Sequence, residues 1–255
     1  MMWMKILSVG DKTLDEALGG GFLEDTVMLL IYDSYSLGWL LSFHIMKERI
    51  KDGDFGLFMN YNLPVSRLGL RMRLLGIDME AEGKKGNLAI VDFFGSRYGI
   101  RYDLDYVYQV ENFDAQTYIP KFLQVYSRII KEKIGDKRAV GVNFTTDGMA
   151  FEIGEDTIIR ILRSNLAHKE QAYLTSAPER KRPVNILNVN KDRVSQRFIA
   201  WLTELSEYVI EFSSKPEGKP FGEEAMNVIK SPLEAFEPAT YAFSIKHGRI
   251  VIHKE

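Results

Sequence analysis

The sequence predicts an α/β fold, with a central, mostly parallel sheet flanked by helices and an antiparallel extension of C-terminal strands. Three observations predict it. Apolar runs of strand length alternate with stretches of helical spacing along most of the chain. Several of these runs are unbroken, as in strands buried on both faces of a parallel sheet. The chain then ends in short strand-like segments joined by tight turns, which favours antiparallel pairing.

Each element follows from a local pattern. Strands are predicted where apolar residues run together, and helices where they recur every three or four positions. Pro64 opens one helix, where its missing N–H costs little, and Gly76 ends it. Glu155 and Asp156 precede another helix at its positive end. The predicted elements are, in order, strand Val27–Tyr32, helix Leu37–Lys51, strand Phe55–Asn60, helix Pro64–Gly76, strand Leu88–Phe93, helix Pro120–Lys133, strand Ala139–Phe144, helix Thr157–His168, strand Gln171–Ser176, and strands Tyr208–Phe212, Ala225–Lys230, Tyr241–Ile245 and Arg249–His253.

Three of these strands carry few polar residues on either face. Val27–Tyr32, Leu88–Phe93 and Ala139–Phe144 are therefore expected in the interior of the sheet.

The composition is that of an ordinary soluble globular protein. The 255 residues are 45% apolar and 27% charged, with a net charge of −2, so no bulk field recruits nucleic acid or anionic membrane. We expect one domain spanning residues 1–255. With no cysteine the chain has no disulfide framework and no thiolate chemistry. We see no signal peptide or membrane span and expect a cytoplasmic protein; abundant Lys and Glu would suit a thermophile.

The start of the chain has the order of a nucleotide-binding unit. TLDEALGGG (Thr13–Gly21) precedes the strand Val27–Tyr32, and a helix follows near Gly38. P-loop NTPases carry GxxxxGK[ST] between such a strand and helix. The segment LDEALGGGFLEDTVMLLIY resembles the opening of RecA-superfamily ATPases, most of all their KaiC/RadA-like branch. Further segments follow in that family's order: RLLGIDMEA (73–81), LAIVDF (88–93), AYLTSAP (172–178), ELSEYVIEF (204–212) and MNVIKSP (226–232).

The phosphate-binding loop that this resemblance implies is degenerate. The family places backbone amides and a lysine on the phosphates and a Ser/Thr hydroxyl on Mg²⁺. Trp39 stands at the lysine position, Leu40 at the hydroxyl position, and Asp33 at the first glycine position, where a carboxylate repels a polyphosphate. Ser34 and Ser36 are the residues that could still donate to an anion. The loop as a whole is Asp33, Ser34, Tyr35, Ser36, Leu37, Gly38, Trp39 and Leu40, of which only Gly38 keeps its family residue.

The other catalytic positions are altered as well. The glutamate pair that would activate water corresponds to Tyr61 and Asn62, and the Walker B aspartate corresponds to Asn143. Asp92 also follows an apolar run, but on the wrong strand by the family's order. ATP hydrolysis needs a positioned water and charge stabilisation by a metal and a cation. We therefore expect no catalytic residue, no cofactor and no metal site.

Two stretches could contact a partner. The basic residues Arg180, Lys181 and Arg182, followed by Lys191 and Arg193, come after the predicted strand Gln171–Ser176, where RecA-like proteins carry a DNA-facing loop. They form either a nucleic-acid contact or a solvated charged surface. The tyrosines between Arg97 and Tyr118 are open to two interpretations. They either stack on the bases of a single-stranded nucleic acid, or they cover a sheet edge or a subunit contact.

The sequence thus favours a non-catalytic protein of the RecA/KaiC type. Its expected role is regulatory or scaffolding, through a protein partner or self-association. One alternative is a nucleic-acid-binding paralogue that uses the basic segment 179–197. A second is a sensor that binds ATP or ADP without turnover, against which the pair Asp33 and Trp39 argues.

Overall fold

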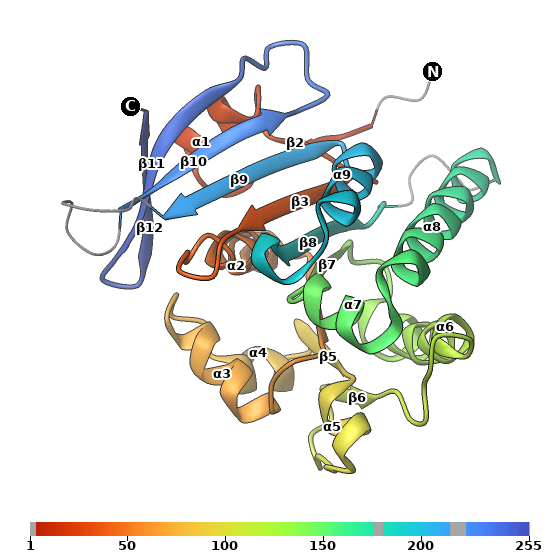
Figure 1. Cartoon of the computed structure of the whole chain (residues 1–255). Coiled ribbons are helices and arrows are strands. Elements are labelled where there is room, and N and C mark those ends of the chain that lie inside the picture. The colour runs from red at the N-terminus through yellow and green to blue at the C-terminus, as the bar shows by residue number, and fades with distance from the viewer. Residues whose placement is uncertain (1–3, 176–180, 215–222, 255) are drawn as a thin grey trace.

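The structure is a computed structural model that describes residues 4–175, 181–214 and 223–254. Within these residues, ten strands form one continuous sheet in the order β12-β11-β10-β9-β3-β8-β7-β4-β5-β6 (Figure 1). A separate pair, β1 (Ile6–Leu7) and β2 (Phe22–Leu23), is antiparallel. The strands of the large sheet are β3 (Val27–Tyr32), β4 (Phe55–Asn60), β5 (Leu88–Asp92), β6 (Val107–Gln109), β7 (Ala139–Asn143), β8 (Val184–Asn190), β9 (Tyr208–Ser214), β10 (Glu223–Lys230), β11 (Ala239–Lys246) and β12 (Arg249–Lys254).

The pairing confirms the predicted α/β fold. All neighbouring strands from β9 to β6 pair in parallel, and β10, β11 and β12 form the antiparallel extension. The strands β3, β5 and β7 each have a neighbour on both sides, as their unbroken apolar runs predict. One detail differs from the expectation. Strand β9 pairs in parallel with β3, so the antiparallel part begins one strand later, at β10.

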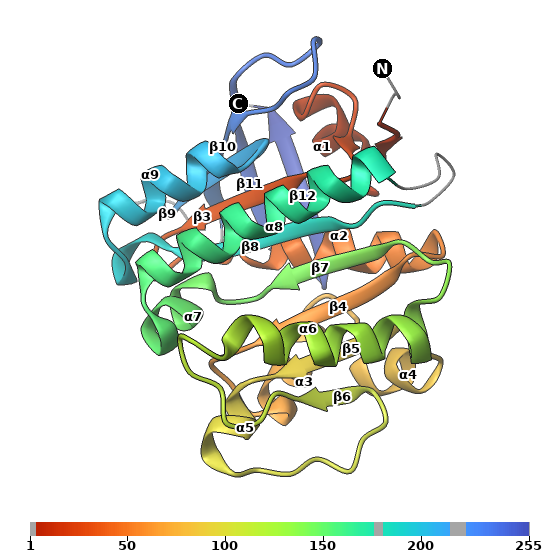
Figure 2. The same ribbon diagram turned by 90° about the vertical axis from the view of Figure 1, so that its right-hand side faces the viewer.

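Helices cover both faces of the sheet (Figure 2). Alternate residues of β3 show the division: Met28 and Leu30 belong to one hydrophobic cluster, and Leu29 and Ile31 to another. The first cluster contains residues of α1 (Lys12–Ala17), α2 (Leu40–Lys51) and α3 (Val65–Arg73), with α4 (Met79–Lys84) beside it. The second contains residues of α6 (Tyr118–Ile129), the π-turn Ile130–Ile134, α7 (Thr146–Ile153), α8 (Glu155–Thr175) and α9 (Gln196–Leu205). The short helix α5 (Phe94–Tyr98) follows β5.

The prediction of a strand over Gln171–Ser176 is wrong. Helix α8 continues through Gln171 to Thr175, and Ser176 lies outside the described residues. The fifth strand of the parallel order is instead β8, Val184–Asn190, which lies between β3 and β7. Leu174 is 73% exposed, so the short apolar run that suggested a buried strand lies on a part of the helix that faces solvent.

The tyrosine-containing segment lies along the β6 edge of the sheet. Tyr106, Tyr108 and Tyr118 are buried, and Tyr98 is exposed. The buried tyrosines pack into the hydrophobic clusters of the sheet, Tyr106 into one and Tyr108 and Tyr118 into the other. None of the helices in the described ranges is both long and apolar enough to cross a membrane.

Candidate functional site

The segment Asp33–Leu40 lies where the sequence places the phosphate-binding loop. It joins the carboxyl end of β3 to α2, which begins at Leu40. Strands β8 and β9 flank β3 on either side, so residues that follow these strands can reach the loop. In open parallel sheets this carboxyl edge is the usual place for a ligand.

A carboxylate of the chain itself occupies the centre of the loop. Glu224 on β10 accepts hydrogen bonds from the Ser36 hydroxyl and, at 2.6 Å, from the Leu37 backbone N–H. The Gly38 N–H donates in turn to Ser36 Oγ at 2.9 Å. Burial raises the pKa of Glu224, while the hydrogen bonds from Ser36 and Leu37 oppose that rise. The Leu37 and Gly38 N–H groups, in the middle of the loop, therefore already have acceptors.

Two further carboxylates accept hydrogen bonds from the N–H groups at the start of the loop. The Ser34 N–H donates to Asp192 Oδ2 at 2.8 Å, and the Tyr35 N–H donates to Asp33 Oδ1 at 2.9 Å. Asp33 also accepts from Ser214 on β9, from its N–H at 2.8 Å and from its hydroxyl at 2.9 Å. Partial burial works to raise the pKa of Asp33, but the hydrogen bonds from Ser214 and Tyr35 hold it below its usual value.

The last residues of the loop pack into the core. Trp39 and Leu40 are buried, and the Trp39 ring lies edge-on to Phe43 and Phe144. The Arg71 guanidinium lies 5.3 Å from the centre of the Trp39 ring. At Gly38 an added Cβ would overlap the ring of Phe212 on β9. The one glycine that the loop keeps is thus required here by side-chain packing.

The two residues that the sequence resemblance places at the catalytic glutamates, Tyr61 and Asn62, are neutral and have other contacts. Tyr61 is buried, stacks on Phe93 with ring centres 4.4 Å apart, and shares a hydrogen bond between its hydroxyl and that of Tyr118. Asn62 packs against Gly148, where an added Cβ would overlap its amide.

Asn143 turns away from the loop. It ends β7, and its Nδ2 donates to Met149 Sδ at 3.5 Å, in the hydrophobic cluster on the opposite face from Trp39. The next residue, Phe144, is the one that contacts Trp39. Asn143, which the sequence resemblance places at the Walker B position, therefore lies on the face covered by α6 and α8.

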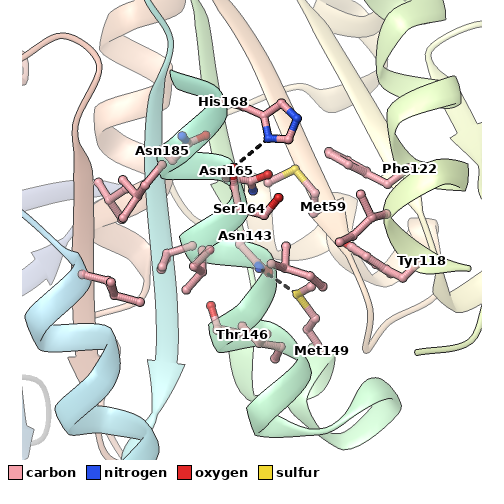
Figure 3. A pocket seen from close by; sticks show the side chains of 18 of the residues that line it. Met59, Tyr118, Phe122, Asn143, Thr146, Met149, Ser164, Asn165, His168 and Asn185 are labelled. Carbon is pink, nitrogen blue, oxygen red and sulfur yellow. Dashed lines mark hydrogen bonds between the residues drawn. The ribbon is translucent and has the colours of Figure 1, made fainter. Parts of the chain in front are cut away.

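On that face lies an apolar cavity, here called the α6–α8 groove, with a volume of about 290 Å³. Its floor comes from neighbouring strands, because the parallel register places Met59, Asn143 and Leu187 side by side. One wall is α6, with Tyr118 and Phe122; the other is α8, with Ser164, Asn165 and His168 (Figure 3).

Comparisons with known proteins concern the fold. No protein-family model matches the chain. A segment of 106 residues, 42% of this chain, is 28% identical to the circadian clock oscillator protein KaiC of Acaryochloris marina (strain MBIC 11017) and corresponds to 20% of that protein's length. Two crystal structures from Pyrococcus horikoshii share the fold at 18% identity. The KaiC-like protein PH0186 has a TM-score of 0.71, with 98% of this chain and 100% of that chain covered.

The second structure is that of the uncharacterized protein PH0321 in complex with an unknown peptide. Its TM-score is 0.79, and the similarity covers 98% of this chain and 99% of that one. The chain has a RecA/KaiC-like fold. The loop between β3 and α2 lies at the place in the chain where the sequence resemblance implies it.

In this RecA/KaiC-like chain the predicted basic residues are not gathered in one loop. Arg182 precedes β8 and Lys191 follows it, so the strand separates them by roughly 30 Å. Arg182 forms an ion pair with Asp25 at 3.1 Å, Lys191 with Glu211 at 2.7 Å, and Arg193 with Asp147 at 3.2 Å. Lys181 is exposed, and Arg180 lies outside the described residues. The expectation of a continuous basic loop over 179–197 is wrong, because its middle is a buried strand.

Sequence reasoning missed the acceptors that fill the loop. Glu224 lies 188 residues from Ser36. One signal was available in the sequence. Buried and partly buried residues alternate along β10, so Glu224 shares its inward face with Met226 and Val228, which are both buried. A carboxylate at an inward strand position needs hydrogen-bond donors, and the loop provides them.

Proposed function

We propose that this RecA/KaiC-like chain is a non-catalytic cytoplasmic protein that binds a segment of a partner protein and acts as a scaffold or regulatory subunit. One observation carries the first half of the proposal. The Glu224 carboxylate accepts from Ser36 and Leu37 in the loop where relatives with intact motifs would hold phosphate. A triphosphate would have to displace this carboxylate and would meet Asp33 and Asp192 beside it, which repel it.

The altered catalytic positions support the same conclusion. Trp39 provides no cation for the phosphates, and Leu40 provides no hydroxyl for Mg²⁺. Tyr61 is engaged with Tyr118, and Asn143 with Met149, so neither faces a water or metal at the loop. Phosphoryl transfer depends on positioning and on charge stabilisation, and each of these residues removes a different part of that arrangement.

The second half of the proposal rests on the fold relative and on the groove. The crystal structure of PH0321, whose fold this chain shares, contains an unknown peptide. The α6–α8 groove offers this chain an apolar concave surface of the kind that binds peptide side chains.

The nucleotide-sensor alternative requires the same loop N–H groups that Glu224, Asp33 and Asp192 occupy. The nucleic-acid alternative depends on cations, and Arg182, Lys191 and Arg193 are each held by a carboxylate.

A thermal-shift screen with ATP, ADP, single-stranded DNA and RNA, combined with an ATPase assay, tests the proposal. A ligand that binds the native state raises the melting temperature by mass action. We expect no shift with either nucleotide and no magnesium-dependent turnover. The variant carrying both Trp39→Lys and Leu40→Thr should stay inactive, since Tyr61, Asn62 and Asn143 are unchanged. Saturable turnover by the unmodified protein, abolished by chelating magnesium, would contradict the proposal.

A further inference from the structure

We infer that the α6–α8 groove is the docking site for the partner, and that its occupant is an apolar peptide segment carrying a side-chain amide or hydroxyl and no basic residue. This inference rests on the proposed function, whose partner-binding half it deepens. Four features of the groove support it.

The walls of the groove are two apolar stripes. Ile119, Phe122, Leu123 and Tyr126 follow each other at helical spacing on α6. Ile158, Ile161, Leu162 and Leu166 do so on α8. Each stripe runs along its helix, so apolar side chains follow one another on both walls of the groove. Such a succession of apolar side chains suits successive side chains of one segment, the helix-in-groove mode of peptide recognition.

The helices leave part of these stripes uncovered. Leu123 is 43% exposed, and Phe122, Tyr126, Leu162 and Leu166 are half-buried. Helices α6 and α8 both run across the same face of the sheet (Figure 2). Residues of both helices line the groove. Apolar side chains at helical spacing normally face another packed element. The described chain provides no such element over this stretch, so an added segment would complete the packing.

The floor carries polar atoms that lack partners. Asn143 Oδ1 and Thr146 Oγ1 are buried, and neither has a hydrogen-bond partner within the described chain. Both residues line the groove, from β7 and the start of α7 (Figure 3). Buried polar atoms are nearly always paired in native proteins. A peptide amide or hydroxyl supplies the missing donor for Asn143 Oδ1 and can also accept from Thr146.

The charges around the groove exclude a basic segment. No acidic residue is among the described residues that line it, and two basic ones are, His168 and Lys169. Lys169 is held by Asp25, to whose carbonyl it donates at 3.0 Å. The His168 ring is exposed, and its Nδ1 hydrogen-bonds to the Ser164 carbonyl at 2.7 Å. A basic peptide residue would find no counter-charge here, whereas an acidic one at the His168 end would be tolerated.

The size of the groove supports a peptide over a nucleotide cofactor. Its volume of about 290 Å³ lies at the lower limit of small-molecule pockets. It accepts a few anchoring side chains of a segment whose backbone stays at the surface.

Selection from random peptides displayed on phage, with the full chain as bait, tests this inference. The most enriched peptide is then synthesised with a fluorescent label, and its Kd is measured by fluorescence polarisation. The groove variants are Leu123→Glu and Leu166→Glu. The matched control is Phe151→Glu, because Phe151 is 89% exposed on α7 and does not line the groove. Circular dichroism melting confirms that each variant is folded.

We expect enriched peptides that are apolar, free of Lys and Arg, and share an Asn, Gln, Ser or Thr. Each groove variant should raise the Kd of the labelled peptide by about tenfold or more, since it places a carboxylate against apolar side chains. The control variant should bind the peptide as tightly as the wild type does. Repeating the selection with Asn143→Leu should remove the preference for amide or hydroxyl residues and keep the apolar pattern.

Three outcomes would overturn the inference. Enriched peptides that bind the groove variants as tightly as wild type would place docking elsewhere and leave the proposed function intact. Absence of any enrichment would reject peptide docking itself. A dimer in sedimentation velocity that Leu123→Glu and Leu166→Glu both abolish would make a second copy of the chain the occupant.

Discussion

Replacing Glu224 by alanine is the most informative perturbation of the filled loop. The change leaves the buried Ser36 hydroxyl and the part-buried Leu37 N–H without their acceptor. Each orphaned buried donor costs about 1–3 kcal/mol, and release of the buried carboxylate, whose pKa is raised by burial, offsets part of this. We expect a net loss of about 2 kcal/mol in the free energy of unfolding. Glu224→Gln keeps one acceptor oxygen and should cost about half as much.

Urea unfolding followed by far-UV circular dichroism measures these losses, with the slope m unchanged if the denatured state is unaffected. Hydrogen exchange supplies the local readout, since the Leu37 and Gly38 amides should lose protection selectively in the alanine variant. Glu237→Ala is the control, because Glu237 is exposed in the connection between β10 and β11. If Glu224→Ala were as stable as this control and its loop amides exchanged no faster, Glu224 would not hold the loop.

Three further variants test separate contacts. Burial raises the pKa of Asp92 to about 6 from an ordinary 3.8, so the folded chain holds a proton between these values that the unfolded chain has released. The contribution of protonated Asp92 to the free energy of unfolding is therefore lost as the pH rises through about 6. In urea titrations, the free energy of unfolding of Asp92→Asn should rise relative to wild type by up to about 3 kcal/mol between pH 4 and pH 7. A difference between variant and wild type that does not change with pH would exclude the pKa shift. Gly38→Ala should lose about 2 kcal/mol because the new methyl meets Phe212, and an unchanged melting temperature would refute that close packing. Thr146→Val removes an unpartnered buried hydroxyl and should gain about 1 kcal/mol, whereas a loss would show that the hydroxyl has a partner.

The parts of the fold that the sequence predicts correctly are those where one local pattern dominates. The run VMLLIY is apolar at every position, and the strand it predicts, β3, is buried at each of them. The helix that Pro64 opens likewise begins at Val65. The failure lies at β8, where VNILNVN contains three asparagines and does not read as a buried strand. Two of those asparagines are accommodated by pairing, because Asn188 Nδ2 donates to Ser42 Oγ at 2.8 Å and Asn190 Nδ2 donates to Ser34 Oγ at 3.3 Å. Such pairing depends on residues distant in the sequence and cannot be read locally.

For the candidate site, too, one part can be predicted from local sequence and another part cannot. The position of the loop Asp33–Leu40 follows from the order of strand and helix, which is a local property. The carboxylate at its centre, Glu224, comes from β10, and Ser214, which donates to Asp33, comes from β9; only the sheet order brings them to the loop. The α6–α8 groove depends on where two helices lie over the sheet, and no motif in either helix marks it.

The central claim is that the loop Asp33–Leu40 is filled by the chain's own carboxylates and does not take a triphosphate. Crystals soaked with magnesium and a non-hydrolysable ATP analogue test it most directly. We predict that the electron density shows Glu224 still bonded to Ser36 and Leu37, with no ordered triphosphate along the loop. Density for the analogue's phosphates at the Leu37 and Gly38 amides, with the Glu224 side chain displaced, would contradict the account.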